Sequence, residues 1–331
     1  MADSDIPVPL FDLPEESLGG EAIGLHRHRG KHAAPPAPEV VERSVTVERS
    51  VTMSLTVTEK VTRTHGTVPP EAPPYDPAFD DEPMAFDGES GHPEAPVYVP
   101  AWASRLAVFD LETTGIDVET SRVVTANISL LDAAGRTVRR RDWLADPGVE
   151  IPEQATAVHG VTTERARAEG RPAAEVVGEI VDELRRAFAD GYALVVYNAP
   201  YDLTLLNRES VRHGIAPLES PSPVVDPLVI DKQVDRYRKG KRTLEAAAGN
   251  YGVSLTDAHD AGADAIAAGR VAQALATKFP IELDLTPRAL HEAQIGWHEA
   301  QCDSFEEYMR RTKDPAFTSR RGWPEAIPRP A

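Results

Sequence analysis

The stretch Phe109-Asp110-Leu111-Glu112-Thr113-Thr114-Gly115 decides the fold of this chain. It continues an apolar run that begins at Leu106, which is typical of a buried strand. Because a strand points alternate side chains to opposite faces, Asp110 and Glu112 should leave it on the same face. Two neighbouring carboxylates repel each other and are costly to bury, so the pair predicts a divalent metal ion between them. A strand end with two solvated acids is the alternative for the pair taken alone.

Another acid, Asp202, follows the apolar run 193–197 and the turn Asn198-Ala199-Pro200. The run reads as a buried strand, so Asp202 is expected at the exit of this strand or in the first turn of the next helix. Helix N-termini favour carboxylates, and helix capping is therefore a second interpretation of Asp202.

A third segment, His259 to Asp264, precedes and enters an alanine-rich helix predicted over 261–278. Residues five apart do not share a helical face. Asp264 is therefore expected on the first turns of this helix and His259 in the loop before it, with Asp257 and Asp260 as capping candidates. A histidine placed there can accept a proton from an attacking water near neutral pH. An ordinary surface histidine is the other interpretation.

The three segments resemble, in order and spacing, the three motifs of the DEDDh 3′–5′ exonucleases, over roughly residues 104–278. The first motif corresponds to 109–115, the second to Asn198-Ala199-Pro200-Tyr201-Asp202, and the third to 259–264. One departure is Pro200-Tyr201, where relatives more often have a small residue and Phe. This departure leaves Asp202 in register.

The resemblance implies an α/β fold, a ribonuclease H-like mixed sheet flanked by helices, and two-metal hydrolysis of a phosphodiester with Mg²⁺ or Mn²⁺. It implies that four carboxylates hold the metals and that His259 deprotonates the attacking water. The implied metal ligands are Asp110, Glu112, Asp202 and Asp264. The expected substrate-binding residues are Leu111, Thr113, Thr114, Asn198, Lys241 and Arg242. A solvated charge run is the alternative for the basic pair.

The rest of this region alternates strand and helix patterns. Strands are predicted over 106–111, 122–131, 136–144 and 193–197 and at 223–225, and the turn Asp132-Ala133-Ala134-Gly135 should join the second and third as a hairpin. Helices are predicted over 172–189, 203–213, 228–237, 243–251 and 261–278. A meander followed by βαβ alternation predicts a mixed sheet with helices packed around it.

Composition divides the 331 residues into three parts. Residues 1–100 are rich in proline and carry 18 acidic against 7 basic side chains, which predicts a largely disordered tail with one strand or hairpin over 40–61. Residues 101–279 form the expected exonuclease domain. Residues 280–331 form a helical C-terminal extension with a long helix over 286–312.

Other features exclude whole classes of protein. A single cysteine, Cys302, excludes an internal disulfide and a cysteine-based zinc site. The net charge of −18 argues against a generally basic nucleic-acid binder. The N-terminus lacks the pattern of a secretory signal, and no stretch has the length of a membrane span, so a cytoplasmic protein is expected.

Three functional hypotheses follow. The first is a metal-dependent exonuclease that removes nucleotides from the 3′ end of DNA, in single-stranded form, during proofreading or repair. A DNA polymerase or repair protein would then bind through the tail or the C-terminal helix. The second is the same chemistry on RNA, and the third is a non-catalytic adaptor that binds partners through the tail and the C-terminal helix.

Overall fold

The structure, a computed structural model, describes residues 99–255 and 259–327, which lie within one compact unit of the chain. The tail predicted over 1–100, with its strand or hairpin over 40–61, lies outside the described residues except for Val99 and Pro100. The boundary at 279/280 between exonuclease domain and C-terminal extension stays a prediction.

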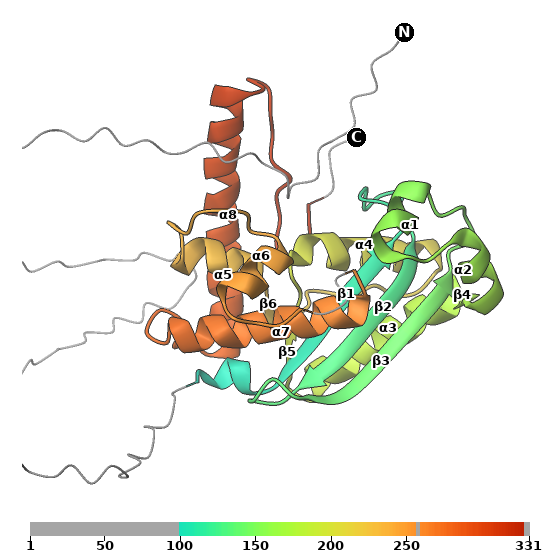
Figure 1. Cartoon of the computed structure of the whole chain (residues 1–331), viewed down its shortest axis with the longest axis horizontal. Coiled ribbons are helices and arrows are strands. Elements are labelled where there is room, and N and C mark those ends of the chain that lie inside the picture. The colour runs from blue at the N-terminus through green and yellow to red at the C-terminus, as the bar shows by residue number, and fades with distance from the viewer. Residues whose placement is uncertain (1–98, 256–258, 328–331) are drawn as a thin grey trace, which may run out of the picture. The chain divides into compact units, whose positions relative to one another are not determined.

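The core is a mixed six-stranded sheet with the strand order β4-β3-β2-β1-β5-β6 (Figure 1). The first three strands form the predicted antiparallel meander, and β5 and β6 continue the sheet in parallel with β1. This arrangement confirms the predicted ribonuclease H-like fold class. The strands are β1 (Leu106–Thr113), β2 (Val123–Leu131), β3 (Thr137–Asp146), β4 (Arg171–Pro172), β5 (Ala193–Val195) and β6 (Val224–Val225).

Helices cover both faces of the sheet (Figure 1). They are α1 (Glu153–His159), α2 (Thr163–Glu169), α3 (Ala173–Ala189), α4 (Ala199–Arg212), α5 (Pro227–Val234), α6 (Leu244–Asn250), α7 (Ala261–Lys278) and α8 (Pro287–Thr312), with a short 3₁₀ helix over Ala101–Ser104. None of these described helices is long and apolar enough to cross a membrane.

The alternation along β1 sets the position of the acidic pair. Phe109 and Leu111 pack into the core on the side of α3 and α4, whereas Val108 packs into the core on the side of α7. Because side chains alternate, Asp110 and Glu112 continue the row of Val108 and leave the strand beside α7. The predicted common face of the two acids is confirmed.

Helix α7 lies unusually close to the sheet. A Cβ built on Gly269 would lie 2.6 Å from Leu131 Cδ1 and closer still to Val108 Cγ1, so no larger residue fits without movement. The buried residues around it are mostly alanines, which allow the same approach along the helix. The first turns of α7, which carry Asp264, are thereby brought to the end of β1.

The C-terminal helix completes an edge of the sheet. Strand β6 pairs with β5 on one side only, and side chains of α8 bond its other side. Val224 N–H donates to His291 Nδ1 (3.1 Å), Gln294 Nε2 donates to Val224 O (3.0 Å), and Asp226 N–H donates to Gln294 Oε1 (2.7 Å). The predicted helix therefore packs on the core through polar residues that take the place of another strand.

Two helices differ from their predicted limits. Helix α4 begins at Ala199 instead of Leu203, because Asn198 adopts a left-handed conformation (φ 65°) that lets the helix start directly at the proline turn. Helix α5 ends at Val234 instead of Tyr237, and a loop of basic residues follows. In this loop the guanidinium of Arg242 donates to the carbonyls of Asp231, Asp235 and Arg238, which fixes the non-helical path.

The close approach of α7 to the sheet predicts a stability difference between two helical glycines. We expect Gly269→Ala to lower the free energy of unfolding by about 1–3 kcal/mol, because the added methyl group overlaps Val108 and Leu131. Gly296→Ala, in α8, meets nothing within 4 Å and should raise the free energy by about 0.5–1 kcal/mol. Urea unfolding of both variants measures the difference; equal effects would contradict the close packing.

Candidate active site

The end of β1 presents two half-buried carboxylates, Asp110 and Glu112. The register with β2 shifts between Glu112 and Thr113, so the ladder becomes irregular where the second acid emerges. Thr114 then bonds back to Arg122, with Arg122 N–H donating to Thr114 Oγ1 (2.9 Å), and this contact closes the loop after the strand.

Helix α4 brings a third carboxylate to the same place. Asp202 lies in the first turn of the helix, as predicted, and is only 3% exposed. Its Oδ1 accepts the backbone N–H of Leu111 (3.1 Å), the residue between Asp110 and Glu112. The carboxylate of Asp202 therefore links α4 to β1 through a hydrogen bond. This role differs from capping its own helix.

Helix α7 supplies the fourth carboxylate. Asp264 Oδ2 accepts the backbone N–H of His259 (3.1 Å), and its Oδ1 is buried without a hydrogen-bond partner. Ligand atoms of Glu112, His259 and Asp264 all lie within 4.8 Å of one another. Asp260 caps the helix as predicted, since its Oδ1 accepts Ala263 N–H (2.9 Å).

Burial and mutual repulsion hold protons on these groups. Burial, followed by the charges of Asp264 and Asp202, raises the pKa of Glu112 to about 8. Burial likewise raises the pKa of Asp202 to about 8, against the opposing bond from Leu111 N–H. Burial, followed by the neighbouring carboxylates, raises the pKa of Asp110 well above its ordinary value, and burial raises that of Asp264.

The donor set fits a divalent metal ion. Across residues 99–255 and 259–327, no lysine or arginine forms an ion pair with Asp110, Glu112, Asp202 or Asp264. The unpartnered Oδ1 of Asp264 offers a buried lone pair, and carboxylate oxygens are the ligands that hard divalent cations prefer. A cation here would remove the repulsion that raises these pKa values.

Beside the carboxylates lies a small cluster of hydroxyl groups. Thr113 Oγ1 lies 2.6 Å from Tyr201 OH, and both oxygens lie 2.7 Å from Gly115 O. Each hydroxyl has one proton, so one of them donates to Gly115 O and the other donates to its neighbouring hydroxyl. The sequence showed Tyr201 only as a departure from the family pattern, and its hydrogen bonds to the loop after β1 were not predicted.

The remaining predicted substrate contacts lie in different surroundings. The side chain of Leu111 is 5% exposed and packs in the core, so its backbone N–H is the part that faces the acids. Asn198 is half-buried, and its backbone N–H donates to Asp226 (3.0 Å). These two residues stay predictions as substrate contacts.

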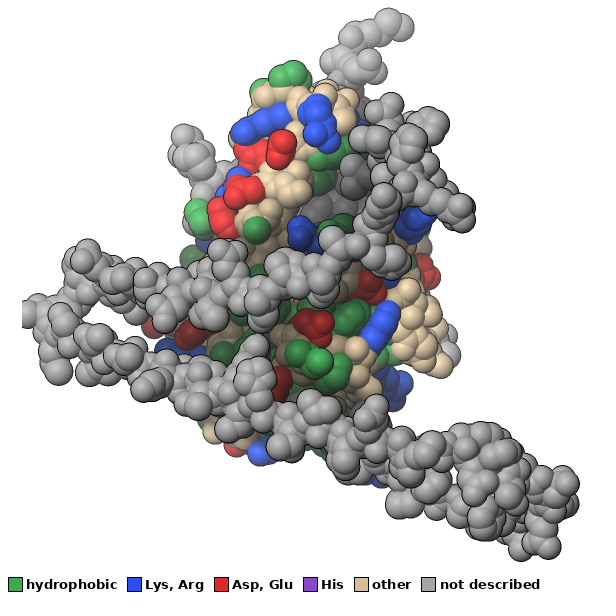
Figure 2. Space-filling model, turned by 90° about the vertical axis from the view of Figure 1, so that its left-hand side faces the viewer, with side chains coloured by type: hydrophobic (Ala, Val, Ile, Leu, Met, Phe, Trp, Pro, Cys, Tyr) green, Lys and Arg blue, Asp and Glu red, His purple; other side chains and the backbone are tan. Residues whose placement is uncertain are grey.

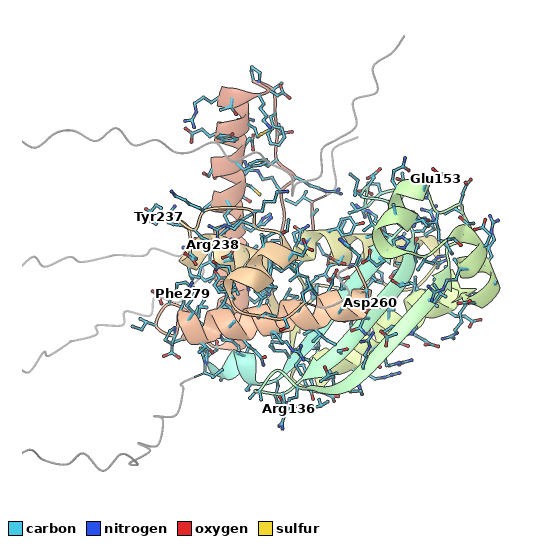
Figure 3. The ribbon with its side chains drawn as sticks, viewed as in Figure 1. Arg136, Glu153, Tyr237, Arg238, Asp260 and Phe279 are labelled. Atoms are coloured by element: carbon cyan, nitrogen blue, oxygen red, sulfur yellow. The ribbon has the colours of Figure 1, made fainter. Side chains whose placement is uncertain are left out.

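The basic pair lies in the loop between α5 and α6. Arg242 binds the buried carboxylate of Asp231 (2.9 Å), and its carbonyl accepts Tyr197 OH (2.7 Å) at the end of β5, whereas Lys241 is exposed. Neighbouring residues of this loop, Tyr237 and Arg238, lie toward the Phe279 end of α7, away from Asp260 (Figure 3). The side chain of Arg242 therefore stabilises the loop itself. Of the two predicted substrate contacts, Lys241 is the more accessible to a nucleic acid.

A second histidine lies near His259. His159, at the end of α1, accepts Val161 N–H through Nδ1 (3.2 Å), and this bond orders the turn after the helix. Burial lowers the pKa of His159, and the nearby His259 lowers it further. The ring is therefore held neutral beside the site.

The sequence of residues 107–272, half of the chain, matches the model of the exonuclease family (RNase_T). The chain belongs to this family. Its three acidic segments and His259 identify an exonuclease domain of the DEDDh type, an enzyme domain whose family uses divalent metal ions.

Similar proteins include parts of bacterial replication enzymes. The chain is 30% identical over 174 residues to a PolC-type DNA polymerase III of Lacticaseibacillus paracasei, and 32% identical over 152 residues to a DNA polymerase III subunit epsilon-like protein of Rhodobacter capsulatus. These matches cover 52% and 45% of the chain but only 11% and 20% of the two relatives. Among solved structures, E. coli exonuclease I in complex with a dT13 oligonucleotide aligns with a TM-score of 0.49 and 20% identity over 55% of the chain and 43% of exonuclease I.

The raised carboxyl pKa values predict how stability depends on pH and metal. In EDTA the folded site holds protons that the unfolded chain releases, so stability should fall as pH rises from about 4.5, the ordinary value for Glu, to about 8. Glu112→Gln removes one charge of the cluster and should raise Tm at pH 8 by about 3 °C, with little change at pH 5. Thermal unfolding in EDTA measures this effect.

The same variant should behave in the opposite way with metal present. In excess Mg²⁺ or Mn²⁺ the wild type should gain stability that Glu112→Gln largely loses, because the variant lacks a ligand. Glu175→Gln, at an exposed position on α3, is the matched control and should leave both comparisons unchanged. A metal-independent Tm for the wild type would contradict the assignment of these carboxylates.

Proposed function

We propose that this chain is a metal-dependent 3′–5′ exonuclease that hydrolyses the terminal phosphodiester of single-stranded DNA. The observation that carries the proposal is the convergence of four carboxylates from β1, α4 and α7, two of which (Glu112 and Asp264) lie beside His259, without an ion pair to lysine or arginine among the described residues. Repulsion between the four carboxylates lowers the stability of the folded protein unless the site binds cations. Such a site matches the demands of phosphoryl chemistry, in which negative charge develops on the reacting oxygens.

The carboxylates of Asp110, Glu112, Asp202 and Asp264 would hold two Mg²⁺ or Mn²⁺ ions. Bound there, the ions would supply charge stabilisation to the attacking and leaving oxygens of the phosphodiester. Asp202 and Asp264 each accept a backbone N–H as well, which fixes one oxygen of each carboxylate.

His259 is the residue that would take the proton from the attacking water. Its backbone is fixed by Asp264 and by its left-handed conformation (φ 71°), while its side chain is exposed beside the acids. A neutral imidazole in this position can act as a general base toward water.

The hydroxyl cluster beside the acids would receive the terminal nucleotide. Thr113 and the backbone around Gly115 form its rim, and Tyr201 fixes their geometry. Lys241, exposed on its loop, would contact a phosphate of the strand.

DNA is the proposed substrate because the relatives above are named as DNA polymerase III proteins. The matched part of the chain is the exonuclease domain, and in a proofreading or repair role this domain would act together with a polymerase or repair protein. The N-terminal tail or α8 would make that contact, in the cytoplasm. Cleavage of RNA is the alternative, and the relative rates on DNA and RNA distinguish the two.

The reaction predicts a defined digestion pattern. With Mg²⁺ or Mn²⁺, 5′-labelled single-stranded DNA should shorten one nucleotide at a time, and Asp110→Asn should lower kcat by at least about 10³-fold because the removed charge serves the transition state. Glu175→Gln, a matched removal of an exposed carboxylate, should leave kcat unchanged. The same assay with labelled RNA ranks the two substrates, and no cleavage of either by folded protein would favour the adaptor hypothesis.

The proposed role of His259 can be separated from its backbone role. Asparagine tolerates the left-handed conformation and cannot act as a base, so His259→Asn should keep the fold and lower kcat by about 10²–10⁴-fold. His259→Ala should lose at least as much. Single-turnover rates at saturating metal measure both variants; a wild-type rate for His259→Asn would restrict this residue to backbone geometry.

A further inference from the structure

Within the proposed function, the structure points to a residue of the site that lies outside the family-matched segment. We propose that Trp323 is a positioning residue of the exonuclease site, acting through Asp226 on the turn that carries Tyr201 and Asp202. The C-terminal segment would then be part of the catalytic unit.

Asp226 is the centre of this arrangement. It follows β6, is fully buried, and caps α5 by accepting Leu228 N–H through Oδ1 (3.0 Å). Oδ1 also accepts Asn198 N–H (3.0 Å), and Oδ2 accepts Ala199 N–H (2.9 Å) and the indole N–H of Trp323 (3.3 Å). Four N–H groups from three separate parts of the chain therefore meet on one carboxylate.

The turn held by Asp226 sets the direction of α4. Asn198 is in the left-handed region, and the two bonds to Asp226 are the ones that satisfy the N–H groups of Asn198 and Ala199 within residues 99–255 and 259–327. Three and four residues after Asn198, Tyr201 reaches Gly115 O and Asp202 reaches Leu111 N. A change in this turn would therefore move a metal ligand and the hydroxyl cluster together.

Trp323 and the residues after it are held by contacts to α8 and α4. Trp323 is 7% exposed, and its ring centroid lies 5.0 Å from that of His291, the side chain that bonds β6. Three residues later, Ala326 N–H donates to Thr204 Oγ1 (2.8 Å) on α4 itself. The segment after α8 thus bonds both the turn and the helix that carries Asp202.

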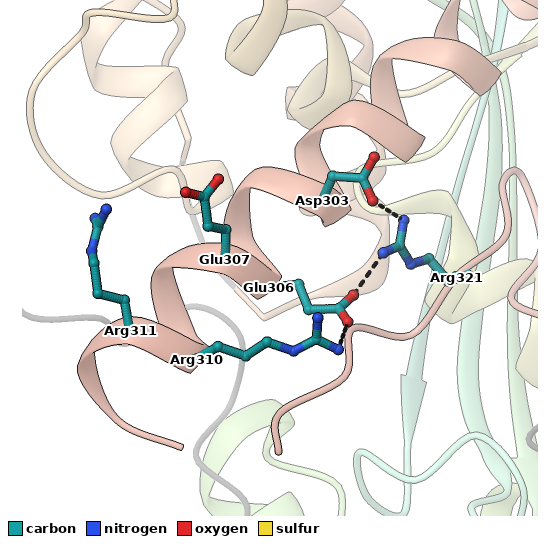
Figure 4. A pocket seen from close by; sticks show the side chains of 6 residues that line it. All are labelled: Asp303, Glu306, Glu307, Arg310, Arg311 and Arg321. Atoms are coloured by element: carbon teal, nitrogen blue, oxygen red, sulfur yellow. Dashed lines mark hydrogen bonds and ion pairs between the residues drawn. The ribbon is translucent and has the colours of Figure 1, made fainter. Parts of the chain in front are cut away.

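Arginines fasten this segment to the rest of the domain. Arg321 binds Asp303 (2.6 Å) and Glu306 (2.6 Å) on α8, and a pocket lined with charged side chains forms around them (Figure 4). Arg320 binds Glu119 (2.8 Å), in the loop after β1, and Arg208 of α4 binds the same carboxylate (2.7 Å). Acidic and basic side chains are interspersed on the part of the surface visible in Figure 2.

Loss of the indole N–H would leave Oδ2 of Asp226 with one donor in a site closed to water. The carboxylate would then shift toward its remaining donors, and the turn at Asn198 would move with it. Residues that only orient a metal ligand typically contribute about 10–100-fold to metal affinity or activity. The expected loss is therefore in kcat and metal affinity, with binding of DNA little changed.

The experiment compares Trp323→Phe with Phe317→Leu in the full chain. Trp323→Phe keeps an aromatic ring against His291 and removes the N–H, whereas Phe317→Leu alters the same segment where it packs on Phe305, away from Asp226. For Trp323→Phe we expect kcat on single-stranded DNA to fall about 10-fold, KM to stay within about 2-fold, and the Mn²⁺ concentration for half-maximal thermal stabilisation to rise several-fold. Phe317→Leu should leave all three values near wild type.

The outcomes are separable from those of the proposed function. Digestion by the wild type tests the function, whereas the difference between the two variants tests the positioning role. Thr204→Val, which removes the bond to Ala326, provides a second variant and should lower kcat in the same direction. If Trp323→Phe matched Phe317→Leu in kcat and in Mn²⁺ response, or lost activity only in proportion to a lower Tm, the proposal would be overturned.

Discussion

The constraint on which this structure depends is the gathering of four carboxylates at the end of one buried strand. Their repulsion opposes folding, and within the described part of the chain no lysine or arginine forms an ion pair with them. The surrounding elements hold the acids in place: Gly269 lets α7 approach the sheet, and Leu111 N–H bonds Asp202. The protein thereby maintains an electrostatically unfavourable site that a divalent cation can convert into a favourable one.

A comparison with Asp226 shows how a structural carboxylate differs from these. Asp226 is as deeply buried as any acid of the site, yet its two oxygens accept four N–H groups. Asp264, by contrast, leaves a buried oxygen without a partner. Backbone and indole donors can satisfy a carboxylate permanently, whereas an oxygen kept without a donor remains available to a ligand. Burial alone does not distinguish a structural carboxylate such as Asp226 from a site carboxylate such as Asp264. The number of hydrogen-bond donors to the carboxylate does.

Much of the site could be predicted from the sequence because its determinants are local. Alternation along β1 placed Asp110 and Glu112 on one face, and the capping pattern at Asp260 placed Asp264 on α7. The start of α4 could not be predicted, because the left-handed Asn198 is stabilised by Asp226, which lies 28 residues later in the chain. The hydrogen bonds of Tyr201 also could not be predicted, because they join residues far apart in the sequence: Gly115, one partner, lies 86 residues earlier.

The C-terminal extension shows that a family match does not mark the limits of a working site. The match ends at residue 272, yet His291 and Gln294 complete an edge of the sheet and Trp323 reaches the carboxylate that organises the second motif. Any protein that bound this segment more tightly in one arrangement of Trp323 would bias the turn at Asn198. Because such coupling is reciprocal, metal binding at the acids would change the affinity for that partner by the same factor. A contact to a replication protein through this end of the chain would therefore be energetically linked to the site.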